Sequence, residues 1–160
     1  MIGYVCKYTP VEVFEAMGVE IRRIQPEVTN FNQADTLMHP NICSFTKSVL
    51  EDVLAGDYEG VVLTTCCDSI RRLYDVLKQQ CPDKFLYLLD VPRKVNDFST
   101  EMYRKNILDM VHAYEAFSGK TFDETVLKQL LKRREAGQNL RTAPKNKASV
   151  HIGLMGARCS

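Results

Sequence analysis

The chain has 160 residues, of which 45% are hydrophobic and 26% are charged. This composition favours one compact domain or slightly more and excludes a disordered chain, which could not bury enough apolar surface. The net charge of +1 gives no electrostatic reason to expect a nucleic-acid partner. No apolar run approaches the roughly 20 residues of a membrane span. Residues 1–5 contain no signal-peptide pattern, so we expect a cytoplasmic protein without a membrane partner.

Short apolar segments alternate with helical segments over the first 92 residues. Four strands are predicted, at residues 2–5, 19–24, 60–65 and 85–89. Three helices are predicted between them, from Pro10 to Gly18, from near Asn41 to Gly56, and from about residue 70 to just before Cys81. Residues 25–41 have no sustained period and are interpreted as a long loop. The alternation predicts an α/β fold in which a parallel sheet of about four strands is covered on both faces.

The pattern becomes helical after Pro92. Residues 99–117 have helical spacing, and residues 121–124 have the form of a capping box that would open another helix. The basic run at 132–134 and the segment 136–147 are interpreted as a solvated helix end and linker. Residues 149–156 resemble a new first strand followed by a glycine turn. We therefore divide the chain into an α/β domain (1–92), a helical extension (93–140), and a linker with the first strand of an absent second α/β domain (141–160).

Cysteine positions give the strongest functional signal. The six cysteines are expected to be thiols, because a reducing cytosol disfavours disulfides; they are Cys6, Cys43, Cys66, Cys67, Cys81 and Cys159. Cys43 lies in the first turn of a predicted helix, and Cys66 and Cys67 open another directly after a strand. The positive end of a helix stabilises thiolate, and the carboxyl ends of parallel strands form one edge. Cys43 and Cys67 could therefore meet there and hold a soft metal or an iron–sulfur cluster.

Other interpretations of these residues stay open. Cys43 and Cys67 could be ordinary structural thiols, and Cys6 and Cys81 are expected to be packing residues or surface thiols. No C-x-x-C pair indicates zinc. A catalytic cysteine needs a base, and the histidine nearest in sequence, His39, is interpreted as a surface loop residue. No phosphate-binding glycine motif supports a nucleotide site.

Several segments together resemble the 2-hydroxyacyl-CoA dehydratase family, which includes 2-hydroxyglutaryl-CoA dehydratase and benzoyl-CoA reductase subunits. The segments are Gly3-Tyr4-Val5, Pro10-Val11-Glu12, Ala16-Met17-Gly18, Asn41-Ile42-Cys43-Ser44-Phe45, Thr64-Thr65-Cys66-Cys67-Asp68, Arg71-Arg72-Leu73-Tyr74 and Asp90-Val91-Pro92. The resemblance covers nearly the whole chain. It implies a Rossmann-like three-layer domain that forms the N-terminal half of a longer subunit.

The resemblance also implies a chemistry and a set of residues. A 4Fe–4S cluster would be held by three cysteines, the first two being Cys43 and Cys67, with Cys66 as the alternative to Cys67. An ATP-dependent activator would supply one electron, and a ketyl radical of the acyl-CoA would then expel the hydroxyl group as water. Glu12 would be a weak candidate for proton transfer. The expected partners are a second dehydratase subunit, the activator and an acyl-CoA substrate.

The chain also departs from the family pattern. Family chains are about twice as long, and their third cluster cysteine lies in the second half; Cys159 does not take its place. We therefore expect an incomplete ligand set and an isolated chain without dehydratase activity. The alternatives are an electron-transfer or non-catalytic iron–sulfur subunit of a related reductase, of the benzoyl-CoA or double-cubane type, and a metal-free interaction domain.

Overall fold

The computed structural model describes residues 1–28 and 30–138. Ten elements follow one another in this part of the chain: β1 (Ile2–Tyr4), α1 (Val11–Ala16), β2 (Ile21–Arg23), α2 (Asn32–Leu37), α3 (Ser44–Ala55), β3 (Gly60–Thr64), α4 (Asp68–Gln80), β4 (Phe85–Leu89), α5 (Asp97–Ser118) and α6 (Glu124–Gln138). The linker and strand expected at 141–160, together with Cys159, lie outside the described residues.

The four strands form one parallel sheet in the order β2-β1-β3-β4, which confirms the predicted α/β fold. β1 pairs with β2 on one side and with β3 on the other, with Gly3 opposite Arg22 and Val61. β3 is buried along its whole length. Its apolar, β-branched run is what a central parallel strand needs, because both of its faces are covered.

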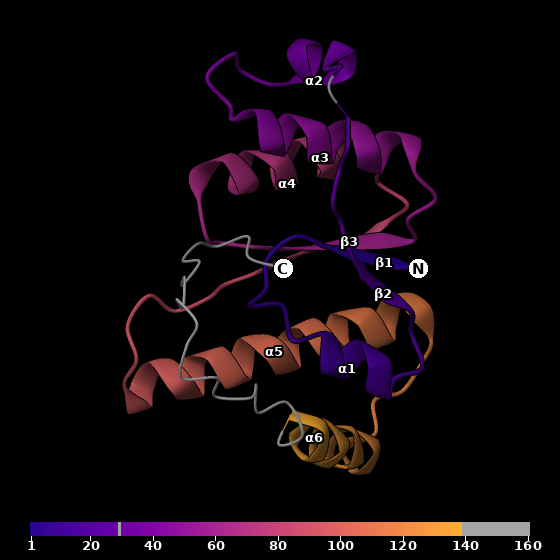
Figure 1. Cartoon of the computed structure of the whole chain (residues 1–160), viewed down its shortest axis with the longest axis vertical. Helices are drawn as coiled ribbons and strands as arrows, with labels where there is room; N and C mark the ends of the chain where they lie inside the picture. Colours follow the sequence, from indigo (N-terminus) through magenta and orange to yellow (C-terminus); the bar gives the residue numbers. More distant parts are fainter. Residues whose placement is uncertain (29, 139–160) are drawn as a thin grey trace, which may run out of the picture.

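Helices cover both faces of the sheet (Figure 1). Successive side chains of β3 point to opposite faces, so Val61 and Leu63 join one core and Val62 joins the other. The first core lies under α3 and α4, including Val49, Leu50, Val53, Ile70, Leu73 and Leu77. The second lies under α1 and α5, including Val13, Phe14, Met17, Met110, Val111 and Tyr114.

The chain leaves the two central strands in opposite directions. After β1 it crosses to α1 on one face, and after β3 it crosses to α4 on the other face (Figure 1). A sheet with this order has its switch point between β1 and β3, where the departing segments leave a crevice at the carboxyl ends of the strands.

Residues 25–41, interpreted from sequence as a loop, contain the short helix α2. The Glu51 carboxylate, on α3, accepts hydrogen bonds from the backbone N–H groups of Gln33 and Ala34, at 2.7 and 2.8 Å. These are unpaired donors of a helix start. The prediction was wrong because the stabilising acceptor is 17 residues further along the chain, where local sequence signals do not show it.

Two predictions about the C-terminal helices need correction. Asp123, rather than Thr121, caps α6: its carboxylate accepts from the Thr125 backbone N–H at 2.7 Å. A reciprocal capping box is instead present at the start of α5, between Asn96 and Ser99.

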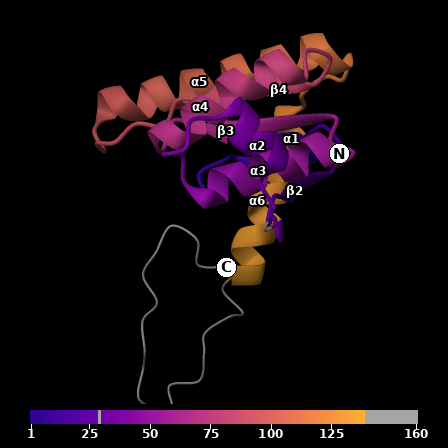
Figure 2. The same ribbon diagram turned by 90° about the horizontal axis from the view of Figure 1, so that it is seen from above.

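The basic run at 132–134 lies within α6, and its Arg134 forms ion pairs with Glu12 and Glu15 of α1. This run is therefore part of a helix that packs against α1, as Figures 1 and 2 show, and is not a linker.

The long helices do not span a membrane: within residues 1–28 and 30–138 no helix combines the required length with the required apolarity. The longest, α5, packs on β4 and contributes Met110, Val111 and Tyr114 to the second core. The proposed boundary between 92 and 93 stays a prediction.

Candidate functional site

A cavity of about 220 Å³ lies at the switch point of the sheet. Its lining comes from the chain after β1, the end of β2, the start of α3 and the turn between β3 and α4. The lining residues are Val5, Cys6, Arg23, Cys43, Phe45, Thr46, Cys66, Cys67 and Ile70. Four of these nine are cysteines, so we call it the thiol cavity.

Cys43 and Cys67 reach the thiol cavity from the starts of two helices. Each is the N-cap residue of its helix, α3 or α4, with extended backbone, and each side chain is exposed. Cys43 is therefore one position before the first turn in which the sequence analysis placed it. Its sulfur lies 3.2 Å from the Thr46 hydroxyl oxygen. Both thiols stand where the positive end of a helix dipole favours negative charge.

Cys66 and Cys6 bring two further thiols to the cavity. Desolvation raises the pKa of the Cys66 thiol, a hydrogen bond with Thr64 opposes the rise, and the neighbouring Cys6 and Cys67 thiols add to it. Cys6 was expected to be a packing residue or surface thiol, yet it lines the same cavity as the predicted ligands. Cys6 follows the last residue of β1 by two positions, as Cys66 follows that of β3, and this shared offset could have identified it.

Hydrogen bonds hold the turn that carries Cys66 and Cys67. The Thr65 hydroxyl donates to the Asp90 carboxylate at 2.5 Å and accepts from the Val91 backbone N–H at 3.1 Å. The Asn106 amide of α5 donates to the Asp90 carbonyl at 3.1 Å. The ends of β3 and β4 are thereby linked to each other and to α5, which fixes the backbone directly before the two cysteines.

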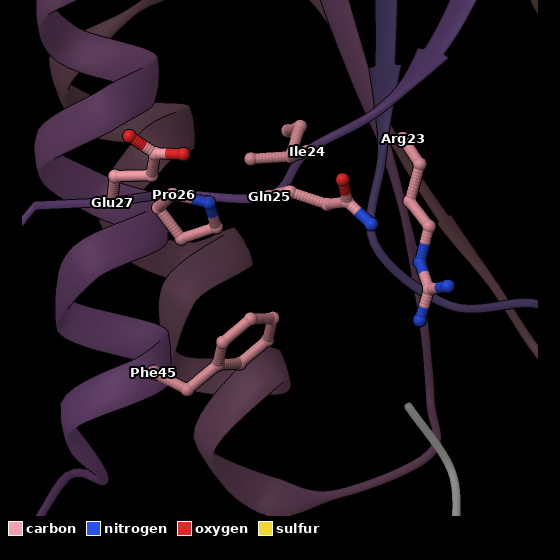
Figure 3. A pocket seen from close by; sticks show the side chains of 6 residues that line it. All are labelled: Arg23, Ile24, Gln25, Pro26, Glu27 and Phe45. Carbon is pink, nitrogen blue, oxygen red and sulfur yellow. The ribbon is translucent and has the colours of Figure 1, made fainter. Parts of the chain in front are cut away.

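Among the described residues that line the thiol cavity, Arg23 is the one with a positively charged side chain, and it was not predicted from sequence. It is half-buried at the end of β2, and no ion pair among residues 1–28 and 30–138 includes it. It also lines a neighbouring cavity of about 310 Å³, which shares Arg23 and Phe45 with the thiol cavity. In Figure 3 the Arg23 guanidinium and the Phe45 ring flank this second cavity, and the Glu27 carboxylate lies on the opposite side of the view from Arg23.

Other residues considered from sequence lie elsewhere. Glu12 is on α1, where its carboxylate accepts a hydrogen bond from Arg134, and it does not line the thiol cavity. His39 borders a separate cavity of about 180 Å³ near Arg72, and its Nδ1 accepts from the Asn41 backbone N–H at 3.2 Å. Cys81 is buried at the end of α4, away from the thiol cavity.

The thiol cavity has the donor chemistry of an iron–sulfur site, although in part only. Thiolates are the ligands that iron–sulfur clusters use. Within the described part of the chain, no group of three or more His, Cys, Asp or Glu side chains is arranged to hold a metal ion. Cys43 and Cys67 line the same cavity, but the described residues do not contain a complete set of cluster ligands.

The parallel α/β topology defines a Rossmann-like protein, and its cysteine-lined cavity lies at the switch point of the sheet. The chain matches the family described as "2-hydroxyglutaryl-CoA dehydratase, D-component" over residues 6–148, and it belongs to this family.

Two curated relatives are similar over 138 residues each. The (R)-phenyllactyl-CoA dehydratase beta subunit of Clostridium sporogenes is 29% identical, over 81% of this chain and 36% of its own. A subunit of the benzoyl-CoA reductase of Thauera aromatica is 25% identical, over 82% of this chain and 36% of its own. The match thus spans about a third of each relative, and both relatives are named as subunits of larger enzymes.

Proposed function

We propose that this chain forms part of an iron–sulfur subunit of a 2-hydroxyacyl-CoA dehydratase, a lyase that removes water from a 2-hydroxyacyl-CoA after one-electron reduction. The observation that carries the proposal is the placement of Cys43 and Cys67, at two helix starts, on one cavity at the switch point of the sheet. Family membership and the dehydratase relative support it.

Cys43 and Cys67 would hold a 4Fe–4S cluster as two of its ligands, with Cys66 as the alternative to Cys67. When bound, the cluster would supply one-electron chemistry to the thioester. The protein's contribution would be to hold the two thiolates at helix N-termini, and to shield their surroundings with the side chains of Phe45 and Ile70, which also line the cavity.

The proposal extends to partners. A second dehydratase subunit would complete the enzyme, an ATP-dependent activator would deliver the electron, and acyl-CoA would be the substrate; the subunit names of both relatives support a multi-subunit assembly. Because thiols must stay reduced to bind iron, we place the protein in the cytoplasm. We expect no turnover from the isolated chain.

Glu12 would be the residue for proton transfer. Its carboxylate is ion-paired with Arg134 and lies on α1, so it would act only on a substrate group brought to that helix. Glutamine at this position should then lower turnover in the complete enzyme while the iron content stays unchanged.

Anaerobic reconstitution with ferrous iron and sulfide tests the proposal. We expect the chain to turn brown and to carry iron and acid-labile sulfide in equal amounts, and both Cys43→Ala and Cys67→Ala to lower that content strongly. Cys81→Ala is the matched control, because Cys81 is a cysteine remote from the cavity. A colourless wild-type protein with every thiol titratable would contradict the cluster and favour a metal-free interaction domain.

A reductase subunit is the second candidate, because the chain is also similar to a benzoyl-CoA reductase subunit. In that role the same two cysteines would hold an electron-transfer or non-catalytic cluster. Combining the reconstituted chain with its partner subunit and activator separates the two: water elimination from a 2-hydroxyacyl-CoA supports the dehydratase, and electron transfer without elimination supports the reductase.

A further inference from the structure

We propose that Arg23 makes the thiol cavity attract anions. The anion that Arg23 stabilises is the negatively charged iron–sulfur centre, and this second statement rests on the proposed function. The residue lines both the thiol cavity and the neighbouring cavity of about 310 Å³. This assigns an electrostatic positioning role to a residue outside every cysteine segment.

The charged side chains around the cavity leave an excess of positive charge. Among the residues that the structure describes, the lining of the thiol cavity contains one arginine and no Asp or Glu. Among the described residues that line the neighbouring cavity, the one carboxylate is that of Glu27, which lies on the opposite side of the view from Arg23 (Figure 3). Arg23 is half-buried and forms no ion pair within residues 1–28 and 30–138. Partial burial of a cation is costly unless an anion compensates it, because burial weakens its hydration.

The cysteines of the same cavity also favour a nearby cation. Four thiols face the cavity that Arg23 lines. Thiolates carry negative charge, and a cluster held by them carries more, so a cation that lines the same cavity would favour both. The helix starts at Cys43 and Cys67 act in the same direction, since the positive end of a helix dipole also favours negative charge.

Arg22 provides a matched control. It is the neighbouring residue on β2 and has the same charge, but it is exposed and lines neither cavity. Arg22→Gln and Arg23→Gln therefore change net charge equally and differ in whether the lost cation borders the thiols. Arg23→Lys keeps the charge and serves as the conservative variant.

The first measurement uses two aromatic disulfides that react with thiols, the dianionic dithiobis(nitrobenzoate) and the neutral dithiodipyridine. In both reactions a protein thiolate attacks the reagent disulfide, a mixed disulfide forms, and one aryl thiolate leaves. Labelling of Cys43 and Cys67 in the full chain is followed by peptide mass spectrometry. The ratio of the two rates reports the local field, because any change in thiol nucleophilicity affects both reagents.

We expect the anionic-to-neutral rate ratio to fall by roughly fivefold to tenfold in Arg23→Gln and by less than about twofold in Arg22→Gln, with the difference shrinking as salt is added. Arg23→Lys should retain most of the wild-type ratio. Equal ratios in the two glutamine variants, with circular dichroism showing both folded, would overturn the inference.

The second measurement is the reduction potential of the reconstituted chain, followed by electron paramagnetic resonance. An added electron makes the centre more negative, so loss of a nearby cation should lower the potential in Arg23→Gln but not in Arg22→Gln. If iron binds and the reduction potentials of Arg23→Gln and Arg22→Gln are equal, Arg23 does not act on the cluster as proposed. If the wild type binds no iron while the rate ratios differ, the proposed function fails and the anion-attracting cavity stands.

Discussion

In the parallel sheet all strands have their carboxyl ends on one side, here called the carboxyl edge, and their amino ends on the other, the amino edge. The two edges differ in how polar groups are arranged there. At the carboxyl edge the segments after β1 and β3 diverge, which leaves the thiol cavity and exposes Cys43, Cys66 and Cys67. At the amino edge polar side chains form hydrogen bonds with one another and with the backbone. The Tyr58 hydroxyl donates to Asp52 at 2.7 Å, and Lys84 donates to the Tyr58 carbonyl at 2.6 Å.

The difference indicates that residues at the amino edge stabilise the fold, whereas residues at the carboxyl edge are available for binding. Residues of the amino edge are bonded to each other or packed against backbone, so changing them should alter the free energy of unfolding. The cysteines of the carboxyl edge are exposed and could be changed with little effect on folding, as is common for binding residues at the ends of parallel strands. The following experiments test this separation, beginning with the largest expected effect.

Gly60→Ala should be the most destabilising change. A Cβ at Gly60 would lie 2.5 Å from the Phe85 Cβ and closer still to the Phe85 carbonyl oxygen, a backbone atom of the paired strand that can move only with the sheet. We expect a loss of about 3 kcal/mol in the free energy of unfolding, measured with urea. Gly119→Ala is the control: its left-handed φ of 71° makes alanine strained, but nothing lies within 4 Å, so about 1 kcal/mol is expected. Equal losses would contradict the argument.

Alkali should weaken the amino edge through two tyrosines. Burial, with help from Asp52 and Glu59 respectively, raises the pKa of Tyr58 and of Tyr114 from 10.0 to about 12. Because the folded protein keeps the neutral phenols, their contribution to stability is complete below pH 10 and is lost as the pH rises toward 12. We expect a loss on the order of 2 kcal/mol per tyrosine.

Urea unfolding at a series of alkaline pH values measures this loss. Tyr114→Phe removes one of the two titrating groups, so its stability should fall less steeply than that of the wild type between pH 10 and 12. An unchanged slope would show that Tyr114 does not contribute.

Thr65→Val should have a smaller effect and should act at the carboxyl edge. The change leaves the Val91 N–H without its acceptor and the Asp90 carboxylate without its donor. We expect a loss of about 1–2 kcal/mol in urea, together with poorer iron retention, because the turn before Cys66 is less well held. Thr36→Val is the control, since Thr36 is exposed and bonds only within α2. Wild-type stability in Thr65→Val would show that this network does not support the turn.

The smallest effect on stability is expected at Cys43 and Cys67. Neither side chain caps the backbone of its helix, and both are exposed, so alanine should change the free energy of unfolding by less than about 0.5 kcal/mol. Cys81→Ala removes a buried group from the first core and should cost about 1 kcal/mol. Calorimetry of the three variants measures their stability. A larger loss of stability in Cys43→Ala than in Cys81→Ala would contradict the proposed difference between the two edges.

Much of the fold was predictable because its signals are local. The apolar run of β3 and the glycine that ends α3 both mark element boundaries within a few residues of themselves. The candidate site was predictable to the extent that Cys43 and Cys67 stand at helix starts beside strand ends. Arg23 carries no such signal, because either of the two arginines in the short edge strand β2 resembles a solvated charge until the neighbouring helix is placed.

The order of apolar runs and helical periods by itself determined a parallel α/β sheet, since burying each run requires that pattern of covering helices. Tertiary structure alone decided that Glu51 stabilises α2, that Arg134 joins α6 to α1, and that Cys6 and Arg23 line the thiol cavity. Each of these contacts joins residues far apart in the chain or on different strands. Their partners are selected by packing, which sequence spacing does not encode.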